Sequence, residues 1–258
     1  MTCREKEKNK SVKNVSDAGK PQFGEDVATE WLLGSDGAMS LRMGRASAGQ
    51  GRSGEPALGK AADHYVRRLH FITAAIDLWG ACGYSHVTIS GLAERTGVTY
   101  GSMRSCFANR DELVQECVRV ARERIGLDKS GYVAAAHDAN QLVETFIDDV
   151  CTSMRVHASL HRIRYDLLSQ SMFDEGLVAD AQSIHAAWMS GISGFAERLH
   201  ALGGSGSDAV VTTRVIEDLF ARTMHRHTVD SADAARLLAA DLRAYVEHLL
   251  GRTADESI

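Results

Sequence analysis

Four side chains that can donate hydrogen bonds cluster in residues 100–105. Tyr100, Ser102 and Ser105 carry hydroxyl groups, and Arg104 carries a guanidinium that stays charged at any physiological pH. Such groups can bind phosphate oxygens and the edges of bases in a duplex groove. They can do so together only if the backbone presents them on one protruding element.

Patterns of known catalytic chemistry do not occur in the sequence. It has no Gly-x-Ser-x-Gly elbow, no phosphate-binding glycine loop and no His-Glu-x-x-His pair. Asp148 and Asp149 are adjacent, so on a helix they point to different sides. We expect both carboxylates to lie on the solvated surface rather than to form a catalytic pair. We therefore expect no enzyme, no catalytic residues and no cofactor.

Two histidine pairs are candidate metal ligands. His157 and His161, spaced at i, i+4, could bind a metal from one face of a helix. His225 and His227 form a second pair in a predicted loop. No acidic residue or cysteine stands at a suitable spacing from either pair, and the five cysteines form no Cys-x-x-Cys motif. The sequence favours hydrogen-bonded or solvated histidines and no metal site.

The stretch from residue 88 to residue 107 has the spacing of a helix-turn-helix. Ala93 allows two helix backbones to approach, Gly97 permits a tight turn, and Met103 closes the pair. Thr88 and Thr99 stand where each helix would begin. A threonine hydroxyl there can accept a hydrogen bond from an otherwise unpaired backbone N–H.

Apolar residues of this stretch predict a small core. Met103 and Phe107 share a face at i, i+4, and Leu92 and Val98 can complete the cluster. The other positions of the second helix would then face outward: Tyr100, Gly101, Ser102, Arg104 and Ser105.

The composition favours an all-α protein. The chain has 258 residues, of which 44% are hydrophobic, enough for a sizeable core. Its two prolines, Pro21 and Pro56, both precede residue 59, so nothing after that point removes a backbone donor from a helix. Aromatic residues are few, and no run of alternating β-branched residues suggests a sheet.

Apolar residues recur every three or four positions after residue 60, which predicts a series of helices. Besides the helix-turn-helix, the expected helices cover residues 62–82, 109–125, a stretch beginning at 138, and residues 159–172, 177–202, 208–223 and 231–250. Residues 1–59 are rich in charge and glycine, and we expect them to be disordered. Residues 60–126 would form a helix-turn-helix domain and residues 127–258 a second helical domain.

Charge is unevenly distributed along the chain. The net charge is −5, but residues 126–258 hold 11 Lys and Arg against 19 Asp and Glu, whereas residues 60–125 hold 9 against 7. The middle segment therefore permits a nucleic-acid partner without requiring one. The N-terminus lacks the apolar core of a signal peptide, and no segment is long enough to span a bilayer, so we expect no membrane association and a cytoplasmic protein.

Residues 71–113 resemble the DNA-binding domain of the TetR family of transcriptional regulators. That pattern has an apolar first helix ending in Gly-Tyr, a capped second helix with Ala-Glu-Arg-x-Gly-Val, a recognition helix and a following phenylalanine. The matching residues are Gly83, Tyr84, Thr88, Ala93, Glu94, Arg95, Gly97, Val98, Thr99, Gly101, Met103 and Phe107. Arg104 and Cys106 replace the tyrosine and histidine usual in the family, and Arg110 replaces its lysine.

The resemblance implies a protein that inserts its second short helix into the major groove of double-stranded DNA. The expected DNA-binding residues are Thr88, Thr99, Tyr100, Gly101, Ser102, Arg104, Ser105 and Arg110. The resemblance also implies a homodimer, joined through its last two helices, that reads a palindromic operator. The leading interpretation is a repressor that a small molecule releases from this operator.

The same resemblance implies a small-molecule site among the C-terminal helices. Its candidate lining residues are Phe146, Met154, His157, Tyr165, Met172, Trp188 and Phe195. The alternative for each of them is a plain core position, because aromatic and methionine side chains at helical spacing usually pack in the core. Two other functions stay open: a TetR-like activator or partner-dependent regulator, and a helical small-molecule-binding protein that has lost DNA binding.

Overall fold

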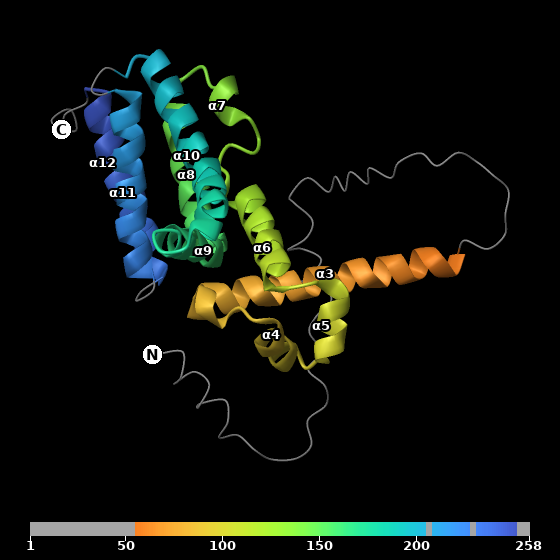
Figure 1. Cartoon of the computed structure of the whole chain (residues 1–258). Coiled ribbons are helices and arrows are strands. Elements are labelled where there is room, and N and C mark those ends of the chain that lie inside the picture. Colours follow the sequence, from red (N-terminus) through yellow and green to blue (C-terminus); the bar gives the residue numbers. More distant parts are fainter. Residues whose placement is uncertain (1–54, 205–207, 228–230, 252–258) are drawn as a thin grey trace. The chain divides into compact units, whose positions relative to one another are not determined.

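The structure, a computed structural model, describes residues 55–204, 208–227 and 231–251. These residues are predominantly helical and contain no strand, which confirms the predicted all-α fold (Figure 1). The elements are α3 (Glu55–Cys82), η1 (Tyr84–His86), α4 (Ile89–Thr96), α5 (Tyr100–Cys106), α6 (Arg110–Ile125), α7 (Tyr132–Ala135), α8 (Ala139–Val156), α9 (Ala158–Gln170), η2 (Glu175–Leu177), α10 (Val178–Ala201), α11 (Ala209–His227) and α12 (Ser231–Leu249). None of the described helices is both long enough and apolar enough to cross a membrane.

The chain divides into two compact units, Met1–Thr73 and Ala74–Ile258, and the boundary falls within α3. Most of the predicted N-terminal extension, residues 1–54, lies outside the described residues. Helix α3 begins at Glu55, earlier than the expected start at residue 62. Pro56 does not prevent this, because a proline in the first turn lacks only an N–H that would have no helical partner. The predicted domain boundaries at residues 60 and 126 stay predictions.

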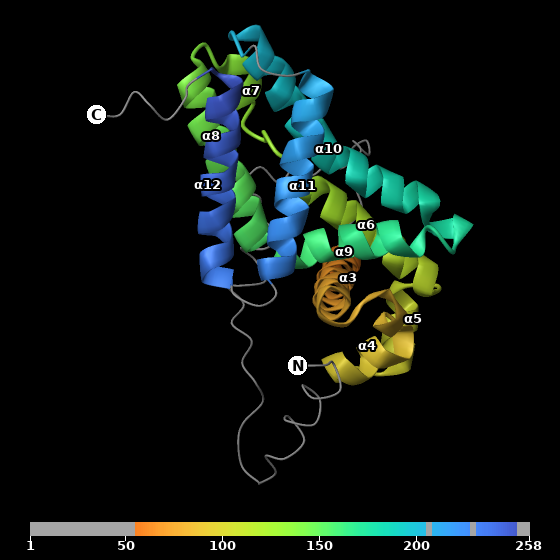
Figure 2. The same ribbon diagram turned by 90° about the vertical axis from the view of Figure 1, so that its left-hand side faces the viewer.

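The second unit holds both the short helices and the long C-terminal ones. Helix α4 packs against α5, and α6 packs against α9 and α10. Its C-terminal core lies among α8, α10, α11 and α12, and α11 and α12 run side by side (Figures 1 and 2). Ile184, Trp188, Ile192 and Phe195, from the predicted inner row of α10, are fully buried, and Leu202 at the end of that row is half-buried just after the helix. The 3.6-residue periodicity thus placed this helix correctly.

Two segments differ from the expectation. The predicted break after α6 contains a short helix, α7, which begins after Gly131 in the left-handed conformation (φ 73°). Helix α11 continues to His227, so His225 lies within a helix rather than in a loop. Both elements lack an apolar period long enough to reveal them, since α7 spans one turn and the end of α11 is polar.

Candidate DNA-binding site and a buried polar network

Helix α4 begins and ends as its sequence predicts. The Thr88 hydroxyl accepts a hydrogen bond from the N–H of Gly91 at 3.0 Å, which caps the first turn. Gly97 ends the helix in the left-handed conformation, with φ 70°, which glycine adopts without steric cost. The N–H of Val98 then donates to the carbonyl of Ala93 at 3.1 Å, and this bond closes the turn.

Helix α5 is fixed by a cap and by two anchors in the core. The Thr99 hydroxyl accepts a hydrogen bond from the N–H of Ser102 at 3.2 Å. Met103 and Phe107 are completely buried, as is Leu92 on α4, whereas Val98, the fourth member of the predicted small core, is half-buried. Cys106, which replaces the usual histidine, is also buried and packs inside. Because these buried residues occupy the inner side of α5, the opposite side of the helix faces outward.

That outward face carries the predicted DNA-binding side chains. Tyr100 is 55% exposed, and Gly101, Arg104 and Ser105 are exposed as well, whereas Ser102 is half-buried. The Ser105 hydroxyl donates to the carbonyl of Ser102 at 2.7 Å, and the Arg104 guanidinium donates to the carbonyl of Ala108. Tyr100 and Arg104 are thus the largest polar groups that α5 presents outward.

Arg110 makes contacts that the sequence did not suggest. Its guanidinium donates from Nε to the carbonyl of Val87 at 2.6 Å and from Nη2 to the carbonyl of Tyr84 at 2.7 Å. The same group lies over the Tyr84 ring, 3.9 Å from the ring centroid. Arg110 thereby fastens the start of α6 to η1. A phosphate contact by Arg110 stays a prediction that competes with this structural role.

The predicted ligand-lining residues separate into two groups. Phe146 and Phe195 stack on each other with ring centroids 3.7 Å apart, and together with Met154 they are completely buried. Met172 differs from the expectation, because α9 ends at Gln170 and leaves its side chain 73% exposed in the following turn. Met172 therefore does not share an interior site with the other six candidates.

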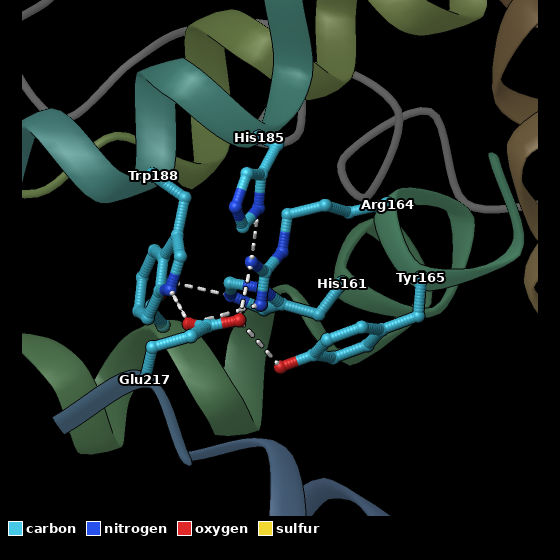
Figure 3. Close-up of polar contacts among 7 residues, drawn as sticks. His161, Arg164, Tyr165, His185, Trp188 and Glu217 are labelled. Carbon is cyan, nitrogen blue, oxygen red and sulfur yellow. Dashed lines mark hydrogen bonds and ion pairs between the residues drawn. The ribbon is translucent and has the colours of Figure 1, made fainter. Parts of the chain in front are cut away.

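The remaining candidates lie in or near a cluster that we call the buried polar network: Arg164, Tyr165, His185, Trp188 and Glu217 (Figure 3). The Glu217 carboxylate is its centre. It accepts hydrogen bonds from Arg164 Nη1 at 2.8 Å, from the Tyr165 hydroxyl at 3.1 Å and from Trp188 Nε1 at 2.6 Å. Arg164 Nη1 also lies 3.1 Å from His185 Nδ1. Three helices, α9, α10 and α11, thus meet at one ion pair.

Aromatic rings surround the cation of this network. The Arg164 side chain is fully buried, and its guanidinium carbon lies 4.2 Å from the Tyr165 ring centroid and 5.4 Å from that of Trp188. Burial raises the pKa of the Tyr165 hydroxyl, so it stays protonated and donates to Glu217. Burial and the Arg164 charge lower the pKa of His185. The network therefore pairs one anion with one cation, and the neutral Tyr165 and Trp188 donate to the anion.

His161 packs against aromatic rings of the core, and burial affects the pKa of both His157 and His161. The His161 ring lies 4.6 Å from both the Trp188 and the Phe220 rings, and Nε2 is 2.9 Å from the Ser153 hydroxyl. Burial and the Arg164 charge lower the pKa of His161 well below its usual value. Burial, with the charges of Lys129 and Arg124, lowers that of His157 to about 4. Within the described ranges, no three or more His, Cys, Asp or Glu side chains gather as they would around a metal ion.

Sequence reasoning missed Arg164, His185 and Glu217. A signal for Arg164 was present, because it lies four residues after Leu160 and three before Leu167, on the inward face of α9. A charged residue at an inward helix position is rarely buried without a partner. The partner on α11 could not be identified, since the pairing joins positions 53 residues apart.

Comparisons with known proteins agree with this geometry. Residues 71–117 match the family model described as "Bacterial regulatory proteins, tetR family". No curated protein matches the sequence of the chain. A protein from Saccharomonospora viridis, described as a transcriptional regulator and solved in complex with choline, is similar in structure, with a TM-score of 0.56 and 15% identity. The match covers 70% of this chain and 95% of that one.

A second similar structure is the fatty acid degradation regulator FadR from Bacillus halodurans. Its TM-score is 0.53 at 14% identity, over 73% of this chain and 96% of that one. At these identities the two structures establish a shared fold, and the family model identifies the helix-turn-helix. Residues 71–117 are therefore similar to bacterial regulatory proteins of the tetR family, and the chain as a whole shares the fold of these two regulators.

Proposed function

We propose that this protein is a homodimeric repressor that binds a palindromic operator through α5 and that a small molecule releases from the DNA. The observation that carries the proposal is the outward face of α5. Tyr100 and Arg104 are exposed there, while Met103 and Phe107 on the opposite face are fully buried. A helix held in this way can enter the major groove without losing its core contacts. We place this activity in the cytoplasm.

The last two helices supply the surface for dimerisation. Helices α11 and α12 pack on each other and still expose apolar side chains, among them Val210, Val211 and Leu237. Apolar side chains outside a folded core are typical of a surface that binds another protein. A two-fold arrangement through this surface would present two α5 helices to two half-sites of DNA.

The buried polar network supports a site for the effector. One similar structure holds choline, so a protein of this fold can bind a small molecule. The network is the main polar feature among the described core residues of α9, α10 and α11. Polar groups within an apolar surrounding are what a small-molecule site uses to orient its ligand. We propose that the effector binds beside Glu217.

A mobility-shift assay on the DNA that flanks the protein's own gene tests the proposal. The wild type should bind a fragment in a salt-sensitive manner, and Arg104→Ala should weaken binding at least tenfold. Arg155→Ala is the matched control, since Arg155 is an exposed arginine on α8, away from the helix-turn-helix. Equal affinity of wild type and Arg104→Ala would contradict the role of α5. Absence of binding would favour a small-molecule-binding protein without DNA-binding function.

The same fragment distinguishes a repressor from an activator or a partner-dependent regulator. In a purified transcription assay, the repressor should reduce transcript levels from the flanking promoter. An increase, or an effect that requires a further protein, would support the second interpretation.

A further inference from the structure

Helix α9 has two faces with different partners. Ser159, Arg162 and Asp166, at i, i+3 and i+7, face the end of α3 and η1, whereas Arg164 and Tyr165 belong to the buried polar network. Consecutive helix residues point about 100° apart, so one rigid helix serves both sets of contacts. Any movement of α9 therefore changes its contacts with α3 and η1 as well as those in the buried polar network.

On the face of α9 that contacts α3 and η1, one carboxylate oxygen of Asp166 accepts two hydrogen bonds. Asp166 Oδ2 accepts a hydrogen bond from Trp79 Nε1 at 2.8 Å and another from the backbone N–H of Tyr84 at 2.7 Å. We call these three residues the Asp166 latch. Hydrogen bonds to a charged acceptor are about twice as strong as those between neutral groups. The latch thus joins α9 to the last turn of α3 and to the first residue of η1.

Close backbone packing reinforces the latch. At Gly80 an added Cβ would lie 2.6 Å from Ser159 Cβ and 2.9 Å from Ser159 Cα, so the backbone of α3 lies directly against Ser159 of α9. Arg162 Nη1 also lies 3.5 Å from the carbonyl of Gly80. The crossing of the two helices leaves little room for α9 to shift while these contacts persist.

Contacts continue from the latch to the helix-turn-helix. The carbonyl of Tyr84 accepts a bond from Arg110 at the start of α6, and the Arg110 guanidinium lies on the Tyr84 ring. Arg110 also binds the carbonyl of Val87, next to the Thr88 cap of α4. Tyr84 is therefore held by α9 through its N–H and by α6 through its carbonyl and ring.

We infer that Asp166 is a positioning residue that fixes the helix-turn-helix in its DNA-binding orientation, and that α9 transmits changes in the buried polar network to it. This inference rests on the proposed function for its link to DNA. When Arg164 or Tyr165 changes partners, α9 rotates or shifts, and the two bonds of the latch lengthen. An effector that binds beside Glu217 thereby weakens the hold on Tyr84.

Amide hydrogen exchange at Tyr84 tests the latch directly, because that N–H donates to Asp166. Asp166→Ala should accelerate exchange at Tyr84 at least tenfold and weaken binding to the flanking DNA by about tenfold, within the range usual for coupled sites. Asp166→Asn should act in the same direction with a smaller effect, since its amide oxygen can still accept both bonds but carries no charge. If the alanine variant loses its helical circular dichroism spectrum, it is unfolded, and the Tyr84 exchange rate of the asparagine variant then tests the latch instead.

The control is Asp148→Ala, which removes the same charge from the exposed face of α8. It should change neither Tyr84 exchange nor DNA affinity. Unchanged Tyr84 exchange in both Asp166 variants, or unchanged or tighter DNA binding, overturns the inference. If the wild type binds no flanking DNA, the proposed function fails, and the exchange rate at Tyr84 still tests the latch by itself.

Coupling to the network is tested with Tyr165→Phe, which removes only the hydroxyl that donates to Glu217. This variant should alter Tyr84 exchange at least threefold in the wild-type background and have no further effect when combined with Asp166→Ala. A merely structural Asp166 would predict the same Tyr165→Phe effect in both backgrounds. No change at Tyr84 in Tyr165→Phe alone would also overturn the coupling.

Discussion

At the scale of single residues, the ion pair between Arg164 and Glu217 organises the interior of the C-terminal helices. The Arg164 side chain is fully buried, and Glu217 is largely so. Desolvation of two such charges is costly, and their attraction offsets it only if further hydrogen bonds satisfy them. Tyr165 and Trp188 supply those bonds to Glu217. Loss of both charges should therefore cost less than the two single losses added together.

Urea unfolding of Arg164→Met, Glu217→Gln and the double variant checks this. Each single variant should lower the free energy of unfolding by roughly 3 kcal/mol, because the charge left behind is buried without its partner. The double variant should be more stable than the sum of the single effects predicts, by about 1–3 kcal/mol. Strictly additive losses would show that the two side chains do not depend on each other.

A second residue-scale prediction concerns pH. The pKa of His157 is about 4 in the folded protein, mainly because of burial, against about 6.5 in an unfolded chain. The unfolded state then binds more protons between these values. The contribution of His157 to the free energy of unfolding is fully present above pH 6.5 and declines as the pH falls toward 4. Buried His161, whose pKa is also lowered, contributes in the same direction.

Replacement of His157 by Gln should reduce this acid-side decline by about 1 kcal/mol, a figure reduced for the partial exposure of the imidazole. Thermal melts at pH 7 and pH 5 provide the measurement. The exposed His200→Gln serves as the control and should leave the difference between the two melting temperatures unchanged. An equal decline in wild type and His157→Gln would exclude His157 as its source.

At the scale of secondary-structure elements, the α3–α9 crossing depends on Gly80. Alanine is usually the better helix residue, by about 1 kcal/mol. At Gly80, however, the added Cβ would lie 2.6 Å from the Cβ of Ser159 on α9. Gly80→Ala should therefore lower the unfolding free energy by about 1–3 kcal/mol, as overpacking does.

Gly194→Ala on α10 is the matched control, since no atom lies within 4 Å of its added Cβ. Chemical denaturation should show this variant to be as stable as the wild type or more stable by about 0.5–1 kcal/mol. A stabilised Gly80→Ala variant would mean that α3 and α9 can separate at little cost.

Some features of these elements could be predicted from the sequence, and others could not. Thr88, Gly97 and Thr99 determine the helix-turn-helix through local chemistry, namely two caps and one left-handed turn, and these were predictable. The inner face of α10 followed from a long unbroken period. Polar contacts between residues far apart in the chain produce no comparable pattern in the sequence. Asp166 meets Trp79 across 87 positions, and Arg164 meets Glu217 across 53, so neither contact could be inferred from spacing.

At the scale of the whole molecule, the proposed function requires two copies of the chain. Leu237 on α12 is 40% exposed and Val211 on α11 is 50% exposed. A buried charge at a dimer interface would lack a partner, and so Leu237→Glu should shift the protein to a monomer. Sedimentation equilibrium measures this directly. Val156→Glu, which places the same charge at an exposed apolar position on α8, should leave the dimer intact.

Monomeric Leu237→Glu should also bind flanking DNA far more weakly, because a single α5 reads only one half-site. If both variants stay dimeric, another surface joins the subunits. If the wild type itself is monomeric at micromolar concentrations, the proposed two-fold reading of DNA is excluded.

The central claim is that α5 reads DNA through Tyr100 and Arg104, and fluorescence anisotropy over a range of salt concentrations tests it most directly. The wild type should bind a labelled flanking fragment at least about 1,000-fold more tightly than a scrambled one of equal length, and its affinity should fall steeply with salt. Arg104→Ala should lower the affinity and, if this arginine binds phosphate, reduce the salt slope by about one. Equal affinity for both fragments, or an Arg104→Ala protein that binds like the wild type, would contradict the account.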